Sequence, residues 1–253
     1  MKKHACLLLF VLLSFGVCAS LARYSQWQQR QKNMANVYAP VYQMIEDAPI
    51  PSAPGSTPAP PSPNQIQKVS DHYESVIGWL EISDVLRYPV VQSSDNTFFL
   101  THDFQGRSSA CGSIFMDFQN DCTPLNQNTV LYGHNMGRAS KLMFSQLTRY
   151  KSLSFWRSHP TLTFDTVSQS YGTWTIFAVC HLPANQASSF FAKEFVSRAV
   201  FTSFVRETQQ KALYDTDIQV PENSRLLTLV TCDRSRYGKD GRLLVLAFCS
   251  SEL

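Results

Sequence analysis

The sequence predicts a mostly β domain, built as a barrel or a sandwich of about eight short strands with few helices. Short runs rich in Val, Ile, Thr and aromatic residues, bounded by Gly, Pro, Asn and Asp, fill the chain from about residue 66 onward. Hydrophobic residues make up 44% of the 253 residues and charged residues 16%, which allows a packed core. The formal net charge of +3, without a dense basic stripe, argues against a nucleic-acid partner.

The expected strands follow one another at short intervals. In chain order they are Val76 to Ile82, Tyr88 to Gln92, Gly112 to Asp117, Asn128 to His134, Thr161 to Phe164, Thr173 to Cys180, Leu226 to Cys232 and Arg242 to Phe248. Two helices are expected between them, a short one in Ala139 to Tyr150 and a longer one in Ser189 to Leu213. In the longer helix, apolar residues at helical spacing predict a face packed on the sheet: Phe191, Phe195, Val196, Ala199, Val200 and Phe204.

The sequence predicts that residues 1–23 comprise a membrane signal-anchor and a short cytoplasmic N-terminus that precedes it. After "MKKH", the run Ala5 to Ala22 has no charge, and its roughly 18 apolar or small residues are near the minimum for one membrane span. The alternative is a secretory signal peptide cut after Ala19, whereas bulky Val17 disfavours a lipoprotein site at Cys18. Both readings place the rest of the chain outside the cytoplasm. The anchor predicts a single-pass protein of the cell membrane with an extracellular domain.

The sequence predicts that residues 24–65 form a stalk and a linker, which precede a domain at residues 66–253. The stalk is polar and has a partly helical pattern that Pro40 is expected to interrupt. Seven prolines between Pro49 and Pro63 form a segment that cannot pack and that favours polyproline II. This segment is read either as a semi-rigid spacer or as a disordered linker.

Seven cysteines are present, and Cys6 and Cys18 lie in the apolar segment. An odd number remains in the domain, and an odd cysteine in an exported protein suggests a reactive thiol. No Cys or His spacing matches a zinc site, so neither a metal nor another cofactor is expected. Cys111 and Cys122 flank one expected strand and are read either as a disulfide or as two separate thiols.

Three residues with complementary chemistry lie at the ends of expected strands. His134 and Cys232 each close a strand, and Arg242 opens the next strand ten positions after the cysteine. Two neighbouring strands joined by a loop would bring Cys232 and Arg242 together, and a third strand beside them would present His134 at the same end. Taken singly, each has an ordinary alternative as a loop histidine, a core cysteine or a surface arginine.

Together, these three residues form a set suited to acyl transfer. A cysteine attacks carbonyls as the thiolate, and at its usual pKa of ~8.5 it is mostly protonated at neutral pH. A nearby imidazole takes that proton and later returns one to a leaving amine. A guanidinium offers fixed donors to the oxyanion that develops on the attacked carbonyl.

These motifs resemble those of the sortases. "TLVTC" with Arg242 downstream matches the TLxTC signature of that family, and "LYGHNM" resembles the segment that contains its histidine. The stretch Tyr88 to Asp117 resembles class B sortases, as does the extra helix between Cys180 and Arg225. The resemblance covers residues 70–249 and implies an eight-stranded sortase-type β-barrel outside the membrane of a Gram-positive bacterium.

The resemblance also implies a cysteine transpeptidase. Cys232 is expected to attack the Thr carbonyl of a sorting motif in a surface protein, while His134 protonates the departing amine and Arg242 holds the oxyanion. An amine of a peptidoglycan precursor or cross-bridge then resolves the thioester. Two alternatives remain: a pilin-polymerising sortase that uses a substrate lysine, and a tethered peptide-binding barrel without chemistry.

Four substrate-binding residues follow from the same resemblance. Asn96 and Leu100 match positions that line the peptide groove of the family, and Thr231 belongs to the TLxTC motif. Asp233 lies where a relative has a Glu that contacts substrate, and Val230 fills the variable motif position, where a relative has a polar residue. The departures at Val230 and Asp233 leave the sorting motif open.

Two other cysteine enzymes fit the chain less well. An L,D-transpeptidase needs its histidine next to its cysteine, whereas His134 and Cys232 are 98 positions apart. A papain-like protease has its cysteine before its histidine and at the start of a helix, and here both the order and the position differ.

Overall fold

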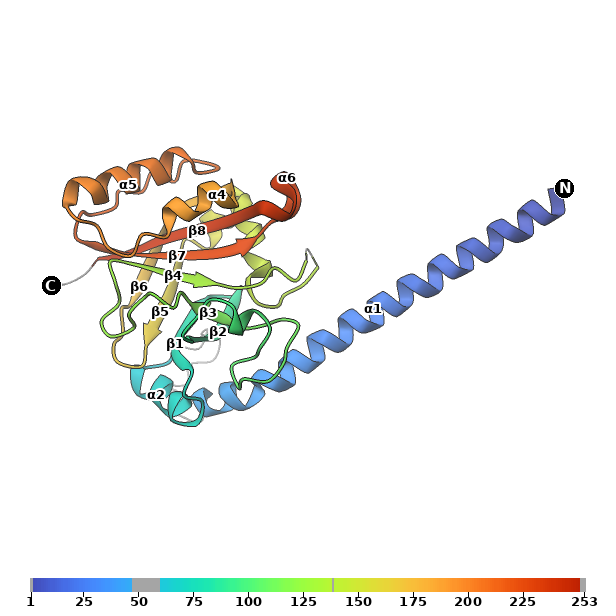
Figure 1. The fold of residues 1–253 in the computed structure, drawn as a ribbon, viewed down its shortest axis with the longest axis horizontal. Coiled ribbons are helices and arrows are strands. Elements are labelled where there is room, and N and C mark those ends of the chain that lie inside the picture. The colour runs from blue at the N-terminus through green and yellow to red at the C-terminus, as the bar shows by residue number, and fades with distance from the viewer. Residues whose placement is uncertain (1, 47–59, 138, 251–253) are drawn as a thin grey trace. The chain divides into compact units, whose positions relative to one another are not determined.

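The structure, a computed structural model, describes residues 2–46, 60–137 and 139–250, without the side chains of residues 2–14, 30 and 31 (Figure 1). The chain divides into two compact units, residues 1–42 and 43–253. Most of the predicted proline-rich linker falls in residues 47–59, outside the described residues.

A single long helix, α1 (Lys2–Glu46), accounts for the first unit and extends into the second. The predicted interruption at Pro40 is wrong, because the helix continues through it. A proline ring fixes φ near the helical value but removes one hydrogen-bond donor and costs a helix interior about 3 kcal/mol or more, and α1 nevertheless continues to Glu46. No helix is long and apolar enough to cross a bilayer within the described part of the chain. The predicted anchor, Ala5 to Ala22, includes residues 5–14, whose side chains lie outside the described part of the chain.

The second unit is a closed barrel with the strand order β1-β2-β3-β4-β7-β8-β6-β5. Its strands are β1 (Val76–Ile82), β2 (Leu86–Val91), β3 (Ile114–Met116), β4 (Asn128–Tyr132), β5 (Thr161–Thr166), β6 (Thr173–Pro183), β7 (Ser224–Cys232) and β8 (Gly241–Ser250). The pairs β2–β3 and β4–β7 are parallel, and the other pairs are antiparallel. The predicted eight-stranded barrel is confirmed, and each strand overlaps its predicted run.

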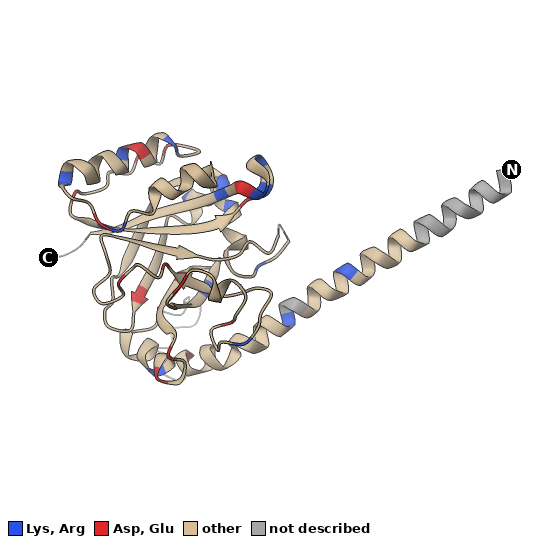
Figure 2. Cartoon of the chain, viewed as in Figure 1, with Lys and Arg blue, Asp and Glu red and all other residues tan. Residues whose placement is uncertain are grey.

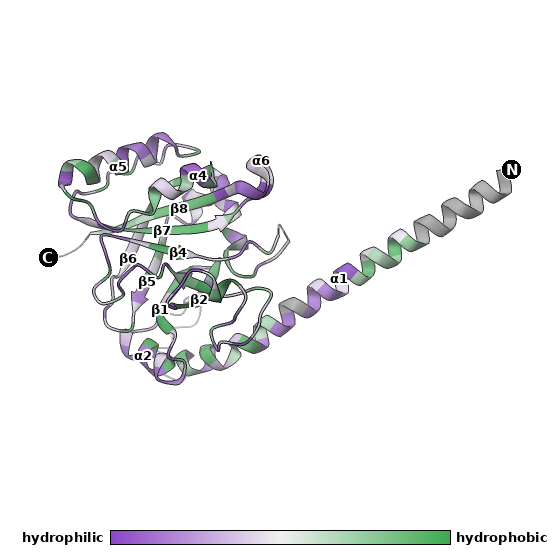
Figure 3. Ribbon diagram, in the orientation of Figure 1, coloured by the Kyte–Doolittle hydropathy of each residue, from purple (hydrophilic) through white to green (hydrophobic). Residues whose placement is uncertain are grey.

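Strands β6, β7 and β8 are buried along nearly their whole length, which explains why their sequences are continuously apolar rather than alternating. Figure 3 shows these strands as mainly hydrophobic. Phe201 and Val205 of helix α5 (Arg198–Gln210) join Phe177 and Leu246 in one apolar cluster outside the sheet. Figure 1 shows α5 and the short helix α4 (Ala184–Ala187) on this side of the barrel.

Helix α5 is shorter than the predicted helix, and its buried face differs from the predicted face. The side chain of Ser197 accepts a hydrogen bond from the backbone nitrogen of Val200, so it caps the helix and sets its start. The buried positions of α5 are Phe201, Val205 and Thr208. The predicted packing is confirmed for Phe191, Phe195 and Phe204, which are partly buried against the apolar cluster, and it is wrong for Val196, which is 94% exposed. The two faces differ because Phe191, Phe195 and Val196 precede the cap and do not share the helical spacing of α5.

The remaining helices are short. Helix α2 (Pro63–His72) was not predicted; it begins with a capping box between Ser62 and Gln65 and buries Ile66 and Val69. The predicted helix in Ala139 to Tyr150 is instead a 3₁₀ helix that begins later. The other short helices are η1 (Phe98–Leu100), η2 (Phe144–Lys151), α3 (Leu153–Ser158), η3 (Ser188–Phe190), α6 (Arg234–Tyr237) and η4 (Gly238–Asp240).

Candidate active site

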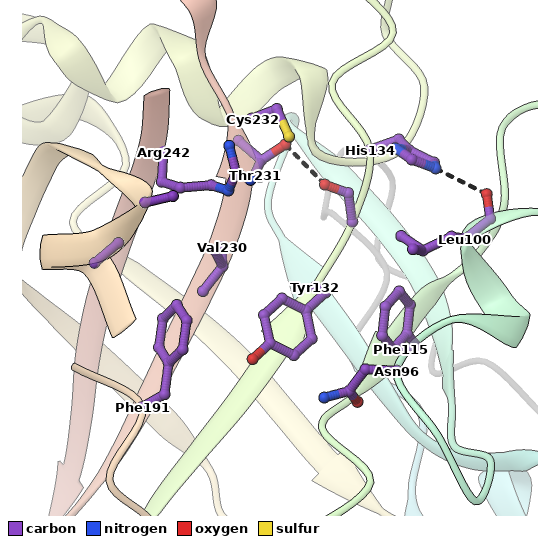
Figure 4. A pocket seen from close by; sticks show the side chains of 13 residues that line it. Asn96, Leu100, Phe115, Tyr132, His134, Phe191, Val230, Thr231, Cys232 and Arg242 are labelled. Atoms are coloured by element: carbon purple, nitrogen blue, oxygen red, sulfur yellow. Dashed lines mark hydrogen bonds between the residues drawn. The ribbon is translucent and has the colours of Figure 1, made fainter. Parts of the chain in front are cut away.

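A pocket of about 510 Å³ opens where β4 and β7 end and β8 begins (Figure 4). It combines apolar walls with a thiol, an imidazole and a guanidinium, which is typical of a site that binds a peptide and reacts with it. The pocket is lined by Asn96, Leu100, Phe115, Tyr132, Gly133, His134, Ala184, Ala187, Phe191, Val230, Thr231, Cys232 and Arg242.

The parallel pairing of β4 with β7 brings His134 level with Cys232. Each residue of β4 pairs with the β7 residue that lies 98 positions later in the chain. Beyond the end of β4, the hydroxyl of Thr231 donates a hydrogen bond of 2.7 Å to the carbonyl of Gly133, so the register continues to the pocket. His134 and Cys232, which have the same separation in sequence, are therefore neighbours at one end of the barrel.

The antiparallel pairing of β7 with β8 brings the guanidinium of Arg242 to the same end of the barrel. Cys232 and Arg242 are directly opposite each other in the β7–β8 register. The Nη1 atom of Arg242 donates hydrogen bonds to the carbonyls of Lys239 (3.1 Å) and Gly241 (3.0 Å), which fix one side of the planar group. Three further N–H groups remain on Nε and Nη2, and within the described residues no hydrogen bond from them to protein is found. These donors are available to a ligand in the pocket.

The His134 ring is held from the opposite side. Its Nε2 atom lies 2.8 Å from the carbonyl oxygen of Leu100, and Figure 4 shows the ring turned toward that residue. A carbonyl only accepts, so Nε2 carries a hydrogen and Nδ1 is the nitrogen that can take up a proton. Among the residues that the structure describes, no hydrogen bond joins His134 to Cys232.

Gly112 packs directly behind the Leu100 carbonyl. Its φ of +57° lies in the left-handed region. A Cβ atom there would lie 2.4 Å from the Phe99 oxygen and 2.8 Å from the Leu100 oxygen. The site therefore needs glycine at this position to keep the acceptor of His134 in place.

A buried carboxylate organises the other end of the pocket. One oxygen of Asp117 accepts hydrogen bonds from Asn96 Nδ2 (3.0 Å) and from the Tyr132 hydroxyl (2.9 Å), and the other lies 3.4 Å from Lys193 Nζ. Burial alone would raise the pKa of Asp117, but the hydrogen bonds from Gln119, Tyr132 and Asn96 and the charge of Lys193 hold it below its ordinary value. Asp117 thus remains ionised and orients two side chains of the pocket.

The predicted substrate-binding residues divide into two groups. Asn96, Leu100 and Thr231 line the pocket. Asp233 is not among the lining residues; it is 4% exposed, and its carboxylate is bonded to Lys151 and Ser235. A role for Asp233 in binding substrate remains a prediction that these contacts do not favour.

Three further residues, Tyr132, Asp117 and Asn135, contribute to the site and were not predicted from the sequence. Asn135 donates a hydrogen bond to the carbonyl of Cys232. Tyr132 and Asn135 lie within the histidine segment Leu131 to Met136, and Asp117 ends a predicted strand. A polar residue at the end of an apolar strand indicates a candidate site residue. The sequence does not show which residues it contacts, because these lie far away along the chain.

The other cysteines are poor nucleophiles. Burial raises the pKa of Cys180 to about 12 and that of Cys249 to about 11. Cys111 and Cys122 remain thiols rather than a disulfide. Cys232 is half-buried and opens into the pocket, so it is the thiol placed to react with a ligand there.

The chain is similar to known proteins in sequence and in fold. A family model described as the sortase domain matches residues 81–249. Sortase B of Listeria monocytogenes is 32% identical over 173 residues, which are 68% of this chain and 68% of that protein. Its sequence therefore resembles about two thirds of this chain.

Solved structures agree with the sequence relatives. The Staphylococcus aureus sortase B–substrate complex superposes with a TM-score of 0.68 at 25% identity, covering 93% of this chain and 98% of that one. A sortase B complexed with triglycine gives a TM-score of 0.71 at 26% identity, covering 87% and 97%. The match of the family model to most of the barrel, together with these relatives, shows that the chain belongs to the sortase family, as a class B cysteine transpeptidase.

Proposed function

We propose that this transpeptidase cleaves a sorting motif of surface proteins after Thr and transfers them to an amine of the peptidoglycan precursor or cross-bridge. The observation that carries the proposal is the common register of His134, Cys232 and Arg242 at one pocket. A non-catalytic peptide-binding barrel would have no need for these three groups at one site.

In the first step, the Cys232 thiolate attacks the Thr carbonyl carbon, and the carbonyl oxygen gains negative charge. The Nε and Nη2 N–H groups of Arg242 offer donors to this oxyanion. As the C–N bond breaks, protonated His134 gives its proton to the departing amine. A thioester between Cys232 and the substrate remains.

In the second step, an amine attacks the thioester, His134 removes the proton of that amine, and the Cys232 thiolate leaves. Support for the two substrates comes from the relatives, since one sortase B was solved with its substrate and another with triglycine. By analogy, the apolar walls around Phe115 and Phe191 bind the sorting peptide, and a glycine amine is the favoured acceptor.

The proposed location is the cell membrane, with the barrel outside and residues 1–23 as the anchor. The support is the length of the uncharged run Ala5 to Ala22. Tethering keeps the enzyme near a membrane-linked acceptor at high effective concentration. A released chain, exported by a cleavable signal, is expected to give less wall-linked substrate at equal enzyme level, and an equal yield would leave the segment a role in export alone.

The test of the proposed reaction uses the full chain in detergent with a library of peptides that contain Thr near the C-terminus. Triglycine and a lysine-containing peptide serve as competing amines, and mass spectrometry identifies the products. Cleavage after Thr with a Thr–Gly bond in the product supports the proposal. Products linked only through the lysine side chain would indicate pilin polymerisation, and no product across the library would contradict the proposal. Cys232→Ala is the negative control.

A further inference from the structure

We propose that Asp233 and Lys151 form a positioning pair that holds Arg242 opposite Cys232, and that Asp233 acts through this pair rather than by touching substrate. The inference rests on the proposed role of Arg242 at the oxyanion and deepens it. Asp233 follows the nucleophile directly, while Lys151 ends η2, a separate element 82 positions away in the chain.

Every polar atom of Asp233 has a protein partner. Its carboxylate accepts hydrogen bonds from Lys151 Nζ (2.5 Å) and from the backbone nitrogen of Ser235 (2.9 Å). Its backbone nitrogen donates to the Gly241 carbonyl (3.0 Å), and its carbonyl lies 3.1 Å from His181 Nε2. The residue is 4% exposed, so a substrate has almost no access to it.

One carbonyl links Asp233 to the guanidinium. The Gly241 oxygen that accepts from the Asp233 backbone nitrogen also accepts from Arg242 Nη1, in both cases at 3.0 Å. A Cβ atom at Gly241 would lie 1.9 Å from the Asp233 oxygen, so the first residue of β8 packs directly against Asp233. Any shift of Asp233 is therefore passed through Gly241 to Arg242.

Lys151 fixes the other end of the pair. Its ammonium also donates to the Ser235 hydroxyl at 3.0 Å, so it holds both the cap and the first turn of α6. Figure 2 shows charged residues gathered around this turn. Burial would raise the pKa of Asp233, but the hydrogen bonds from Lys151 and Ser235 and the Lys151 charge keep it below its ordinary value. The carboxylate is consequently ionised whenever the enzyme works near neutral pH.

The expected consequence concerns the rate of chemistry more than binding. The donors of Arg242 must meet an oxygen that becomes charged only in the transition state, and a misplacement of about 1 Å can cost about 100-fold in rate. Loosening the pair should thus lower kcat while KM changes little. A residue that contacts substrate in the ground state would instead raise KM.

The first experiment measures kcat and KM for peptide cleavage by the full chain in detergent. Lys151→Met, which removes the charge and keeps the stem, and Asp233→Asn are each expected to lower kcat by roughly 10-fold to 100-fold, with KM within about twofold. Lys151→Arg should recover most of the rate because it restores the cation. The matched control is Lys211→Met, which breaks the exposed Lys211–Glu207 ion pair of α5, away from the pocket, and should change neither parameter.

The second experiment needs no peptide, so it separates this inference from the proposed function. The Nε–H signal of Arg242 is assigned by NMR as the one lost in Arg242→Lys, and the rate of Cys232 alkylation by iodoacetamide is measured in parallel. Lys151→Met is expected to shift or broaden the Arg242 signal while alkylation stays unchanged. An unmoved signal, or a rise in KM at unchanged kcat, overturns the inference. An equal loss of signal, alkylation and thermal stability would mean a purely structural role and would overturn it too.

Discussion

The side-chain amide of Asn135 donates a hydrogen bond of 2.8 Å to the carbonyl oxygen of Cys232. Its oxygen accepts from the backbone nitrogen of Gly137 at 2.9 Å, so one side chain joins the segment after His134 to the end of β7. The distance between base and nucleophile thus depends on a polar bridge as well as on strand pairing.

Cys232→Ala is expected to abolish peptide cleavage and to leave the melting temperature nearly unchanged, because this half-buried thiol contributes little packing. A methanethiosulfonate reagent at pH 8 should label Cys232 and block turnover, whereas Cys180 and Cys249, with pKa values raised to about 12 and about 11 by burial, should react slowly. Peptide mapping by mass spectrometry identifies the labelled thiols. Turnover in the alanine variant would exclude Cys232 as the nucleophile.

Gly112→Ala should impair catalysis without touching the pocket. The new Cβ would collide with the carbonyls of Phe99 and Leu100, at 2.4 Å and 2.8 Å, and displace the acceptor of His134. We expect a loss in kcat/KM that approaches the loss in His134→Ala, and a changed pH–rate profile. Gly106→Ala is the control, since its φ of +75° brings similar strain but nothing lies within 4 Å of the added Cβ. Equal behaviour of the two glycine variants would contradict the predicted role of the Leu100 carbonyl.

Arg242→Lys should be a poor enzyme. An ammonium cannot both bond the Lys239 and Gly241 carbonyls and present a planar set of donors to the pocket. Losing such a donor typically costs about 10²–10³ in kcat. Steady-state kinetics on the same peptide, together with unchanged iodoacetamide labelling of Cys232, checks this result. A near-normal kcat would show that a positive charge at position 242 is enough for catalysis and that the planar guanidinium is not required.

Asp117→Asn should weaken peptide binding. If the amide oxygen keeps the place that accepts from Asn96 and Tyr132, the amide nitrogen faces two donors, the Gln119 backbone nitrogen and Lys193, and Lys193 loses its counter-charge. We expect KM to rise by roughly 10-fold with a smaller change in kcat. Asp121→Asn, an exposed change in the same loop, is the control.

The same substitution tests a dependence on pH. The pKa of Asp117 is lowered on folding, so its contribution to stability is complete above its ordinary value of 3.8 and is lost as the pH falls through the folded-state pKa. Thermal melts of the wild type and Asp117→Asn should therefore differ by a constant amount at pH values well above 3.8 and converge as the pH falls through the folded-state pKa. A difference that persists at low pH would mean that Asp117 contributes through packing rather than through its charge.

Truncation should be sensitive to a few residues ahead of the barrel. A chain that starts at Pro60 keeps the Ser62 cap and all of α2, whereas a chain that starts at Ile66 loses the cap, Pro63 and Gln65. The loss of a cap costs about 1 kcal/mol, which lowers Tm by roughly 2–4 °C in a domain of this size. Calorimetry of the two truncated chains measures the difference, and equal Tm values would show that the cap and the first three residues of α2 add no stability.

The strands were readable from the sequence because each apolar run is bounded by turn residues, and the paired ends of β7 and β8 follow from a short connection. Helix α5 was misjudged because Ser197, an ordinary polar residue in the sequence, ends the preceding segment by capping. Helix α2 left a readable signal, since Ser62 and Gln65 have capping-box spacing. The contact between Lys151 and Asp233 left none, because 82 positions separate them and only the closed barrel brings them together.

The parallel pairing of β4 with β7 also bears on how the enzyme matures. His134 and Cys232 come from segments that meet only after the chain between them has closed into a loop. Such closure is slow because the conformational entropy of the loop is lost before the contacts between the strands form. A chain whose barrel is still open consequently holds an isolated thiol without its base. Barrel closure then acts as the activating event, and the recovery of transpeptidation after dilution from denaturant should report the folding time of the sheet.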